Sequence, residues 1–313
     1  MKILIPELIH PQALERLRAA HEVVFDPTLF TRRSELLAAA QDAHALIVRN
    51  RTQVRDDLLD ALGKCRAVGR LGVGLDNIDV PGCKARGIEV IPALGANARS
   101  VAEYVVTCAM LLLRYSHYSV SGALADGRWV RPAKPEGHEV AGRTLGLIGF
   151  GSIGQLTGRL ASRLDMHVVA HDPMFRAQAA LDFEYRMLPL DELLATSDVV
   201  SLHIPLMPET RGLINAERLA LMQPGAVLIN AARGGIVDEA ALARALSEGR
   251  LRAAALDVFE DEPLPSGSVL AGAPNLLLTP HVAGVTADSE MRVGELVAER
   301  ILTLLREAHG ECK

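Results

Sequence analysis

Three side chains in the last third of the sequence have the types needed for proton and hydride chemistry. They are Arg233, followed by two glycines, Glu262, at the end of an acidic run, and His281, after Thr-Pro. An arginine binds a carboxylate as a planar fork, and a histidine can donate a proton to a keto oxygen while a nicotinamide supplies hydride to the carbon. A neighbouring carboxylate favours the protonated histidine. We therefore expect an oxidoreductase that reduces 2-keto acids, with these three residues catalytic.

A glycine-rich segment upstream has the pattern of a dinucleotide-binding loop. It follows the apolar run Leu145–Ile148 and opens a helical pattern. The first glycine permits a tight turn, the second lets backbone N–H groups approach a pyrophosphate, and the third lets the helix pack closely on the strand. The residues expected to bind the cofactor here are Gly149, Gly151, Ser152, Ile153 and Gly154.

Asp172 ends the next predicted strand, at the distance expected of an acid that binds the ribose hydroxyls. Its charge would repel a 2′-phosphate, so we expect NAD as the cofactor in preference to NADP. Arg176 lies nearby in the sequence, and its positive charge is the one feature that favours NADP, which carries the 2′-phosphate. The structural alternative for Asp172 is an Asp-Pro turn.

Length and composition narrow the class of protein. A chain of 313 residues is long enough for two domains. A net charge of −5 and an aromatic content of 4% argue against a nucleic-acid partner. Four scattered cysteines without a C-x-x-C pair indicate no metal site and fit a reducing compartment. The longest apolar run, Tyr104–Leu113, is too short for a bilayer, so we expect a cytoplasmic protein without a membrane partner.

Short apolar runs alternate with longer segments of helical period along the whole chain. Continuous apolar strands separated by helices predict parallel sheets covered on both faces. The predicted fold class is α/β with two doubly wound parallel-sheet domains, a Rossmann-type NAD domain and a flavodoxin-like substrate domain. The predicted strands of the first series are Lys2–Pro6, Glu22–Phe25, Ala45–Val48, Ala67–Leu71 and Glu89–Ile91. Those of the second series are Thr144–Gly149, His167–His171, Val199–His203, Ala226–Asn230, Ala253–Val258 and Leu276–Thr279.

The remaining segments suggest the domain boundaries. A long helix is expected from about Ser100 to Ala123, with a capping box over Ser100–Glu103, and Asp126–Gly142 is expected to be a loop. The final helix, about Ala287 to Glu307, follows the completed second sheet, so we expect it to return to the first domain. The predicted domains are residues 1–97 plus 288–313 for substrate binding and residues 98–287 for NAD binding.

The motifs, taken in order from about Leu71 to Gly284, resemble those of the D-2-hydroxyacid dehydrogenase family. The matching segments are Gly149–Gly154, His203–Leu206, Asn230–Asp238, Asp257–Pro263 and Thr279–Gly284, and residues 69–79 resemble the substrate loop of the phosphoglycerate dehydrogenase branch. The resemblance implies that Arg233, Glu262 and His281 are the catalytic residues and that Asp257 holds the nicotinamide carboxamide. It also implies two lobes with the active site in the cleft, and a homodimer built around the nucleotide domain.

Further residues are expected to line the cofactor and substrate sites. His203 is expected to shape the cofactor wall with Pro205, and the backbone N–H groups of Gly72-Val73-Gly74 could bind a small carboxylate. Asn97 either caps the long helix or, by the resemblance, touches the substrate. The expected cofactor contacts are completed by Ala231, Arg233, Asp257 and His281, and the expected substrate contacts by Arg233 and His281.

Arg49 and Arg51 leave a predicted strand with period-2 spacing, so both would point to one side if the chain stays extended. The segment resembles an Arg-Ser-Arg-Thr element of some phosphoglycerate dehydrogenases, in which arginines contact phosphate. The alternative is a solvent-exposed pair. If Arg51 faces the substrate, the distal group is a phosphate, sulfonate or carboxylate, and we favour a phosphoglycerate-like substrate.

Other functions stay open at this point. Residues 281–286 also resemble sulfolactate dehydrogenases of the same family. Reduction of hydroxypyruvate or glyoxylate is an alternative within the enzyme class. Outside that class, some relatives are NAD-sensing corepressors that keep all three catalytic residues, and the absence of long tails argues against that interpretation.

Overall fold

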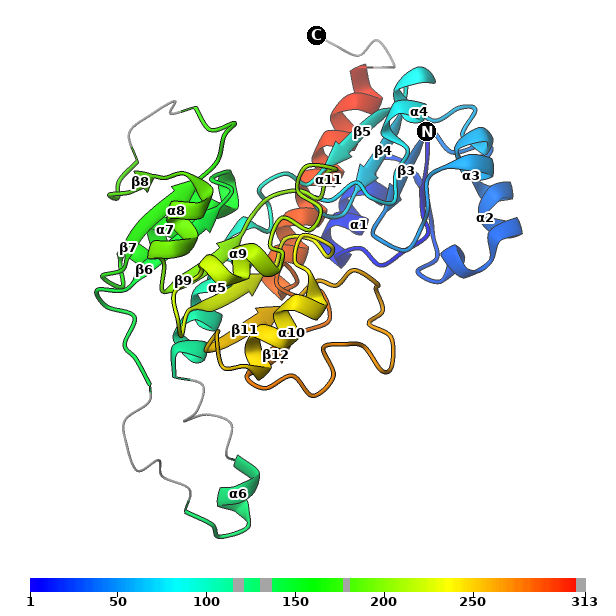
Figure 1. Ribbon diagram of the computed structural model, residues 1–313. Coiled ribbons are helices and arrows are strands. Elements are labelled where there is room, and N and C mark those ends of the chain that lie inside the picture. Colours follow the sequence, from blue (N-terminus) through cyan, green and yellow to red (C-terminus); the bar gives the residue numbers. More distant parts are fainter. Residues whose placement is uncertain (115–120, 130–136, 177–180, 308–313) are drawn as a thin grey trace. The chain divides into compact units, whose positions relative to one another are not determined.

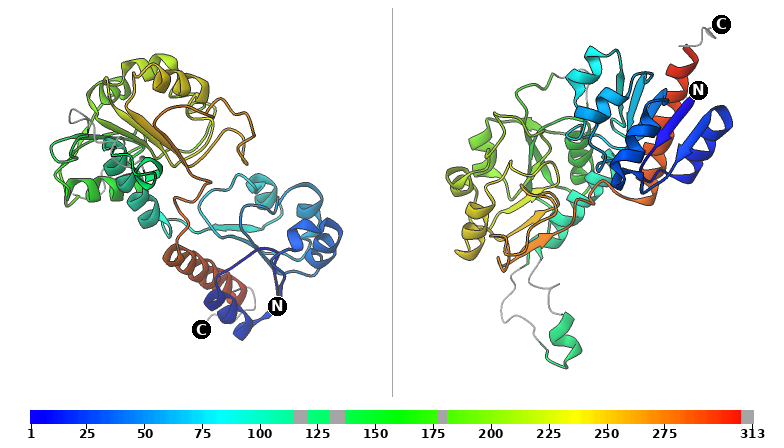
Figure 2. Two further views of the ribbon diagram at one scale, coloured as in Figure 1. Left: turned by 90° about the horizontal axis from the view of Figure 1, so that it is seen from below. Right: turned by 90° about the vertical axis from the view of Figure 1, so that its right-hand side faces the viewer.

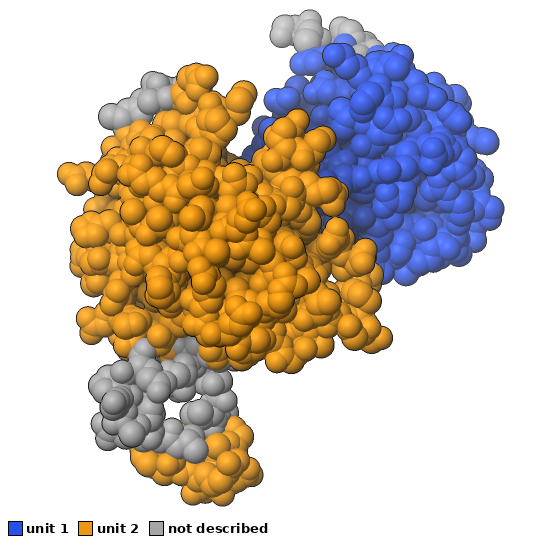
Figure 3. All heavy atoms as spheres, in the orientation of Figure 1, with its two compact units in different colours: residues 1–97, 285–313 blue, residues 98–284 orange. Residues whose placement is uncertain are grey.

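The computed structural model describes residues 1–114, 121–129, 137–176 and 181–307. The chain divides into two compact units (Figure 3). Unit 1 contains Met1–Asn97 and Val285–Lys313, and unit 2 contains Ala98–Gly284. Each unit has a parallel sheet with helices on both faces (Figure 1), which confirms the predicted α/β fold class.

Unit 1 has a five-stranded parallel sheet in the order β2-β1-β3-β4-β5. This is the flavodoxin-like order. Helices α1 and α11 cover one face, where they lie side by side (Figure 2), and α2, α3 and α4 cover the other. The strands are β1 (Lys2–Ile5), β2 (Glu22–Phe25), β3 (Ala45–Val48), β4 (Ala67–Arg70) and β5 (Glu89–Pro92). The helices are α1 (Pro11–Ala20), the 3-10 turn η1 (Leu29–Thr31), α2 (Arg33–Ala40), α3 (Asp56–Ala61), α4 (Val80–Ala85) and α11 (Ala287–Glu307).

Unit 2 has a seven-stranded parallel sheet in the order β12-β11-β10-β9-β6-β7-β8, which contains the Rossmann order. Helices α5 and α7 cover one face, and α8, α9 and α10 cover the other. The strands are β6 (Thr144–Ile148), β7 (His167–His171), β8 (Arg186–Met187), β9 (Val199–Leu202), β10 (Val227–Asn230), β11 (Ala253–Leu256) and β12 (Leu276–Leu278). The helices are α5 (Ala98–Leu113), α6 (Ser121–Ala125), α7 (Ser152–Ser162), α8 (Leu190–Thr196), α9 (Ala216–Leu221) and α10 (Glu239–Ser247).

The start of the long helix differs from the prediction. Helix α5 begins at Ala98, so Ser100 lies inside its first turn and is buried. The capping box was therefore wrong. The Glu103 carboxylate instead pairs with the side chain of Arg99, one helical turn earlier. Ala123 belongs to the separate helix α6, and parts of the predicted helix and loop, residues 115–120 and 130–136, lie outside the described residues.

The strand orders define where ligands should bind in each unit. In open α/β sheets, ligands lie beyond the carboxyl ends of the strands, at the point where the strand order reverses. That point falls between β1 and β3 in unit 1 and between β6 and β9 in unit 2. Among the helices that the structure describes, none has the length and apolar composition needed to cross a membrane.

Candidate active site

The glycine loop follows β6 at the reversal point of unit 2. Gly149 has φ +96°, and a Cβ at this residue would lie 2.5 Å from the carbonyl oxygen of His203, which follows β9. A Cβ at Gly154 would lie 2.3 Å from the Gly149 carbonyl oxygen. Both glycines are thus required by close backbone packing, which brings the start of α7 against the end of β6.

Gly151 differs from its two neighbours because a Cβ there would meet no described atom within 4 Å. Its position next to open space matches a glycine that lets a ligand approach the backbone. Gly151 is the N-cap of α7, so the N–H groups of Ser152 and Ile153 lie in the first turn, where they have no partner within the helix. These N–H groups and the positive end of the helix dipole suit a pyrophosphate.

Asp172 lies directly after β7, the strand next to β6. Its Oδ2 accepts a hydrogen bond of 2.9 Å from Phe150 N in the glycine loop, and its Oδ1 accepts one of 2.9 Å from Met174 N. A carboxylate has about four acceptor sites, so two remain for ribose hydroxyls. The Arg176 guanidinium, the feature that favoured NADP, donates hydrogen bonds to the carbonyl oxygens of Pro173 and Phe175.

His203 lies across the reversal point from the glycine loop. Burial lowers the pKa of its imidazole to about 4, so the ring is neutral at physiological pH. Its Nε2 is buried and has no hydrogen-bond partner among the described residues. A neutral, desolvated ring is suited to form a wall against a cofactor and is unsuited to supply a proton. Pro205, two residues on, is exposed.

Glu262 and His281 form a pair. The Nδ1 atom of His281 lies 2.8 Å from Oε2 of Glu262, and Oε1 of the same carboxylate accepts a hydrogen bond of 3.1 Å from Phe259 N. The other two members of the acidic run are placed elsewhere: the Glu260 carboxylate lies 3.6 Å from Arg211, and the Asp261 side chain is exposed. With Nδ1 donating to Glu262, the Nε2 atom of His281 is the ring nitrogen available for proton transfer.

Arg233 follows β10, and the turn that presents it is fixed by Asn230. The Asn230 side chain accepts a hydrogen bond of 3.0 Å from Ala232 N and donates one of 2.9 Å to Arg233 O. Gly234 then packs against the loop after β11, because a Cβ there would lie 1.7 Å from Phe259 O. The loops that carry Arg233 and Glu262 are thus held together by backbone packing within unit 2. Ala231, in the same turn, is half-buried.

Asp257 is buried and has a structural task that the sequence did not reveal. Its Oδ1 accepts hydrogen bonds from Thr279 Oγ1 at 2.6 Å and Val282 N at 2.8 Å, and its Oδ2 accepts one from Ala283 N at 2.8 Å. These donors flank His281, whose backbone has the uncommon φ of +56°. Three bonds within the protein leave about one acceptor site for a carboxamide.

Tyr104, in α5, extends this network and was also missed. Its hydroxyl lies 2.7 Å from Thr279 Oγ1, and burial raises the pKa of the phenol above its ordinary value. The sequence separation of 175 residues explains the omission, since neither local pattern nor spacing connects the two.

In unit 1, the substrate loop after β4 offers fewer N–H groups than expected. The N–H of Gly72 donates to Arg70 O at 2.8 Å, so it is already engaged. Within the described part of the chain, the N–H groups of Val73 and Gly74 donate to no other group. The prediction that the Gly72 N–H group binds a substrate carboxylate was therefore wrong. The N–H groups of Val73 and Gly74 remain candidates for that contact.

Arg49 and Arg51 differ in their surroundings. The guanidinium of Arg49 makes a two-pronged ion pair with the Glu290 carboxylate, at 2.6 and 2.5 Å. Arg51 is exposed, its guanidinium lies 5.3 Å from the centre of the Phe30 ring, and it has no acidic partner among the described residues. The two arginines thus do not act as an equivalent pair.

Asn97 precedes α5 but does not cap it in the expected way. Its Oδ1 accepts no hydrogen bond from the described residues, whereas an N-cap oxygen would accept one from the first turn. The interpretation of Asn97 as a helix cap is therefore not supported, and its contact with the substrate stays a prediction.

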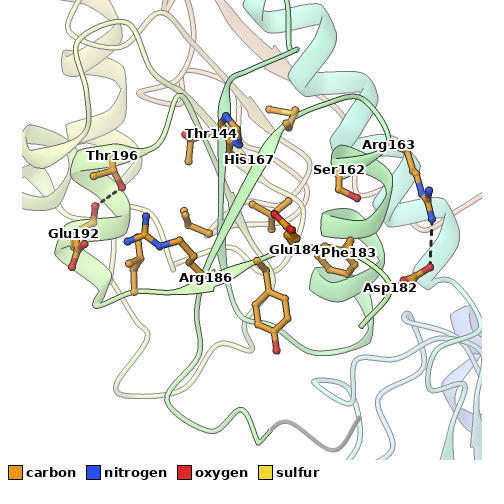
Figure 4. A pocket seen from close by; sticks show the side chains of 15 residues that line it. Thr144, Ser162, Arg163, His167, Asp182, Phe183, Glu184, Arg186, Glu192 and Thr196 are labelled. Carbon is orange, nitrogen blue, oxygen red and sulfur yellow. Dashed lines mark hydrogen bonds and ion pairs between the residues drawn. The ribbon is translucent and has the colours of Figure 1, made fainter. Parts of the chain in front are cut away.

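A separate cavity of about 880 Å³ opens on unit 2 beside β7, β8 and α8 (Figure 4). Thr144 and His167, the first residues of β6 and β7, line it. It therefore lies at the amino ends of the strands, the edge opposite to the glycine loop. Its charged rim is mixed, with Arg163 paired to Asp182, and it is not the cofactor site. Within the described ranges, no group of three or more His, Cys, Asp or Glu side chains could hold a metal ion.

Comparisons with known proteins show which family the chain resembles. Residues 106–283 match the family model for the NAD-binding domain of D-isomer-specific 2-hydroxyacid dehydrogenases. The chain is 49% identical over 300 residues to an (S)-sulfolactate dehydrogenase of Chromohalobacter salexigens, covering 96% of each chain. It is 38% identical to a D-3-phosphoglycerate dehydrogenase of Methanocaldococcus jannaschii, covering 98% of this chain but 58% of that one. The structure of a glyoxylate reductase from Paecilomyes thermophila matches with a TM-score of 0.86 at 28% identity, covering 98% of this chain and 96% of that one.

The chain belongs to the D-isomer-specific 2-hydroxyacid dehydrogenase family. It is an NAD-dependent 2-hydroxyacid dehydrogenase, which confirms the predicted enzyme class and cofactor. The relatives and the solved structure named above are dehydrogenases and a reductase, so the comparisons favour an enzyme over the corepressor alternative. The preference for a phosphoglycerate-like substrate is not supported over the sulfolactate alternative, because the sulfolactate dehydrogenase has the higher identity of the two relatives.

Proposed function

We propose that the enzyme interconverts (S)-sulfolactate and sulfopyruvate, a 2-keto acid with a distal sulfonate. The observation that carries the proposal is the 49% identity to an (S)-sulfolactate dehydrogenase over 96% of both chains. By contrast, the chain spans 58% of the length of the phosphoglycerate dehydrogenase from Methanocaldococcus jannaschii. Phosphoglycerate is the second candidate, favoured by the Arg-x-Arg-Thr segment and by the 38% identity.

The three unit 2 residues would divide the chemistry. Arg233 holds the carboxylate common to all 2-keto acids as a bidentate fork. His281 donates a proton from Nε2 to the keto oxygen, and Glu262, 2.8 Å from Nδ1, orients the ring. Bound NADH supplies the hydride that completes the reduction. In the reverse direction His281 accepts the hydroxyl proton.

The residues that would hold the cofactor fit its parts. The open space at Gly151 and the first-turn N–H groups of α7 suit the pyrophosphate, and Asp172 suits the ribose hydroxyls. His203, Pro205, Ala231 and Asp257 would line the remaining cofactor surface, with Asp257 offering its last acceptor site to the carboxamide. Unit 1 would contribute Val73 and Gly74 N–H groups to the carboxylate and Asn97 to the substrate.

Arg51 would bind the distal sulfonate. It has no acidic partner within the described residues, whereas the charge of Arg49 is neutralised by Glu290. We therefore assign the distal contact to Arg51 and a structural role to Arg49.

A panel of 2-keto acids assayed by NADH consumption tests the proposal. The panel is sulfopyruvate, phosphohydroxypyruvate, oxaloacetate, hydroxypyruvate and glyoxylate. We expect the highest kcat/KM with sulfopyruvate. A higher value with phosphohydroxypyruvate would establish the second candidate, and equal values with hydroxypyruvate or glyoxylate would rule out selection by a distal anion.

We also propose that the enzyme is a cytoplasmic homodimer. Leu124 in α6 and Trp129, four residues after the end of that helix, have exposed fractions of 44% and 83%, and a subunit contact would bury them. Cys65, Cys83 and Cys108 are buried free thiols, which fits a reducing compartment. Light scattering at several concentrations would test the dimer, with Trp129→Ser expected to shift the mass toward the monomer.

A further inference from the structure

Glu7 is a buried carboxylate, 3% exposed, that binds the backbone of a single short loop. Its Oε1 accepts hydrogen bonds from Arg49 N at 2.9 Å and Thr52 N at 3.0 Å, and its Oε2 accepts one from Arg51 N at 3.1 Å. Carboxylates are rarely buried without a cation unless several N–H groups compensate the charge. Here the three backbone N–H groups compensate the charge of the Glu7 carboxylate.

The position of Glu7 follows from the strand order of unit 1. Glu7 lies just past the end of β1, and Arg49 lies just past the end of β3, the strand paired with β1. In the flavodoxin-like order this is where the strand order reverses, and open α/β sheets bind ligands there. The loop held by Glu7 is thus at the place in unit 1 where a ligand is expected.

The same loop is held from two other directions. Asn77 donates from Nδ2 to Arg49 O at 3.2 Å and to Thr52 O at 2.7 Å. The side chain of Arg49 is fixed by Glu290 in α11. Backbone N–H and carbonyl groups on both sides of Arg51 are therefore fixed, while its guanidinium keeps no acidic partner among the described residues.

We propose that Glu7 is a positioning residue for substrate specificity: it fixes the Arg49–Thr52 loop so that Arg51 meets the distal anion of the substrate. The proposal rests on the proposed function, since it requires that the distal group be anionic. A fixed backbone lowers the ordering entropy that Arg51 would otherwise lose on binding. Nothing in the amino-acid pattern distinguishes Glu7, because its partners lie 42 to 45 residues away.

The sign of the effect separates this role from simple electrostatics. Glu7 carries a negative charge near the proposed sulfonate contact, so removal of that charge alone would attract an anionic substrate and lower its KM. If the Arg49–Thr52 loop were no longer fixed, the KM for the anionic substrate would instead rise. In Glu7→Gln, one oxygen is replaced by an NH2 group, which sets donor against donor at one or more of the three N–H groups.

We expect Glu7→Gln to raise the KM for sulfopyruvate about tenfold, the range of one lost charge-assisted hydrogen bond. The KM values for hydroxypyruvate, which has no distal charge, and for NADH should stay within about twofold. Asn77→Ala, which removes the two bonds to the loop carbonyls, should give the same split. Glu15→Gln, an exposed glutamate of α1, is the matched control and should change neither KM.

The outcomes are distinguishable from failure of the proposed function. If the parent enzyme prefers hydroxypyruvate to sulfopyruvate, the proposed function is wrong whatever Glu7 does. Suppose instead that the parent enzyme prefers sulfopyruvate. The positioning role is then overturned if Glu7→Gln lowers the KM for sulfopyruvate or leaves it unchanged, or if it changes the KM values of all substrates equally. Amide hydrogen exchange of the parent keeps the test open should both variants fail to fold. The N–H groups of Arg51 and Thr52 should be protected from exchange without substrate. Rapid exchange would refute the proposal that Glu7 fixes the loop.

Discussion

The buried carboxylate of Asp257 is the point where a conservative substitution should do most damage to the loop that carries His281. Asp257→Asn preserves size and shape but replaces one acceptor oxygen by a donor. The carboxylate accepts three hydrogen bonds, two at Oδ1 from Thr279 and Val282 and one at Oδ2 from Ala283.

The magnitude follows from the geometry of these bonds. The best orientation of the amide keeps both Oδ1 bonds and turns its NH2 toward Ala283 N, so one bond is lost and a buried N–H is left without a partner. A lost charge-assisted bond costs about 1.5–3 kcal/mol, and an unsatisfied buried group about 1–3 kcal/mol. Because the two costs overlap, we expect the free energy of unfolding to fall by about 3 kcal/mol.

Urea unfolding followed by circular dichroism measures this loss, and steady-state assays measure its effect on His281. We expect kcat to fall at least about tenfold, because the positive φ of His281 depends on its neighbours being held. Asp261→Asn, an exposed position in the loop after β11, is the control and should be neutral. A change below about 0.5 kcal/mol in Asp257→Asn would show that the three bonds do not anchor the loop.

The other predictions concern the cofactor, pH and the substrate. Asp172→Ala should narrow the preference for NADH over NADPH, mainly through the cofactor KM, and comparable efficiencies in the parent would refute the role of Asp172. Burial lowers the pKa of His203 from 6.5 to about 4, so between these values the unfolded chain binds a proton that the folded chain does not, and stability falls as pH falls. The parent should therefore lose free energy of unfolding between pH 7 and pH 4, and His203→Gln should reduce this loss by up to about 3 kcal/mol. Urea unfolding midpoints of both proteins at the two pH values measure the difference. Arg51→Ala should raise the KM for sulfopyruvate about one to two orders of magnitude and spare glyoxylate, whereas Arg233→Ala should impair both. Equal losses on both substrates in Arg51→Ala would show that Arg51 is structural.

Much of the fold could be predicted because its signals are local. Strands such as Ala45–Val48 are buried on both faces and read as continuous apolar runs. Strand β8 was missed because it has two exposed residues, Arg186 and Met187, and gains its definition from pairing with β7. The start of α5 was misplaced because Glu103 pairs with Arg99 instead of closing a capping box.

The site was predictable where a motif fixes the backbone and unpredictable where partners are remote. The glycines after β6 act within a few residues of one another. The Glu262-Pro-Leu-Pro context and the family resemblance together singled out the member of the acidic run that contacts His281. The partner of Arg49, Glu290, lies 241 residues away, so its ion pair could not be read from spacing. Side chains that bind loops from a distance, such as Glu7, carry no local signal.

The most direct test of the account is the effect of His281→Ala on the reduction of sulfopyruvate, measured beside the affinity for NADH. If His281 is the proton donor held by Glu262, kcat should fall roughly 10²–10⁴-fold, the range of a general acid. The dissociation constant of NADH, from quenching or transfer of its fluorescence, should stay within about twofold of the parent value. A kcat within a few fold of the parent, or a loss explained by weaker NADH binding, would contradict the assignment of His281 as the catalytic acid.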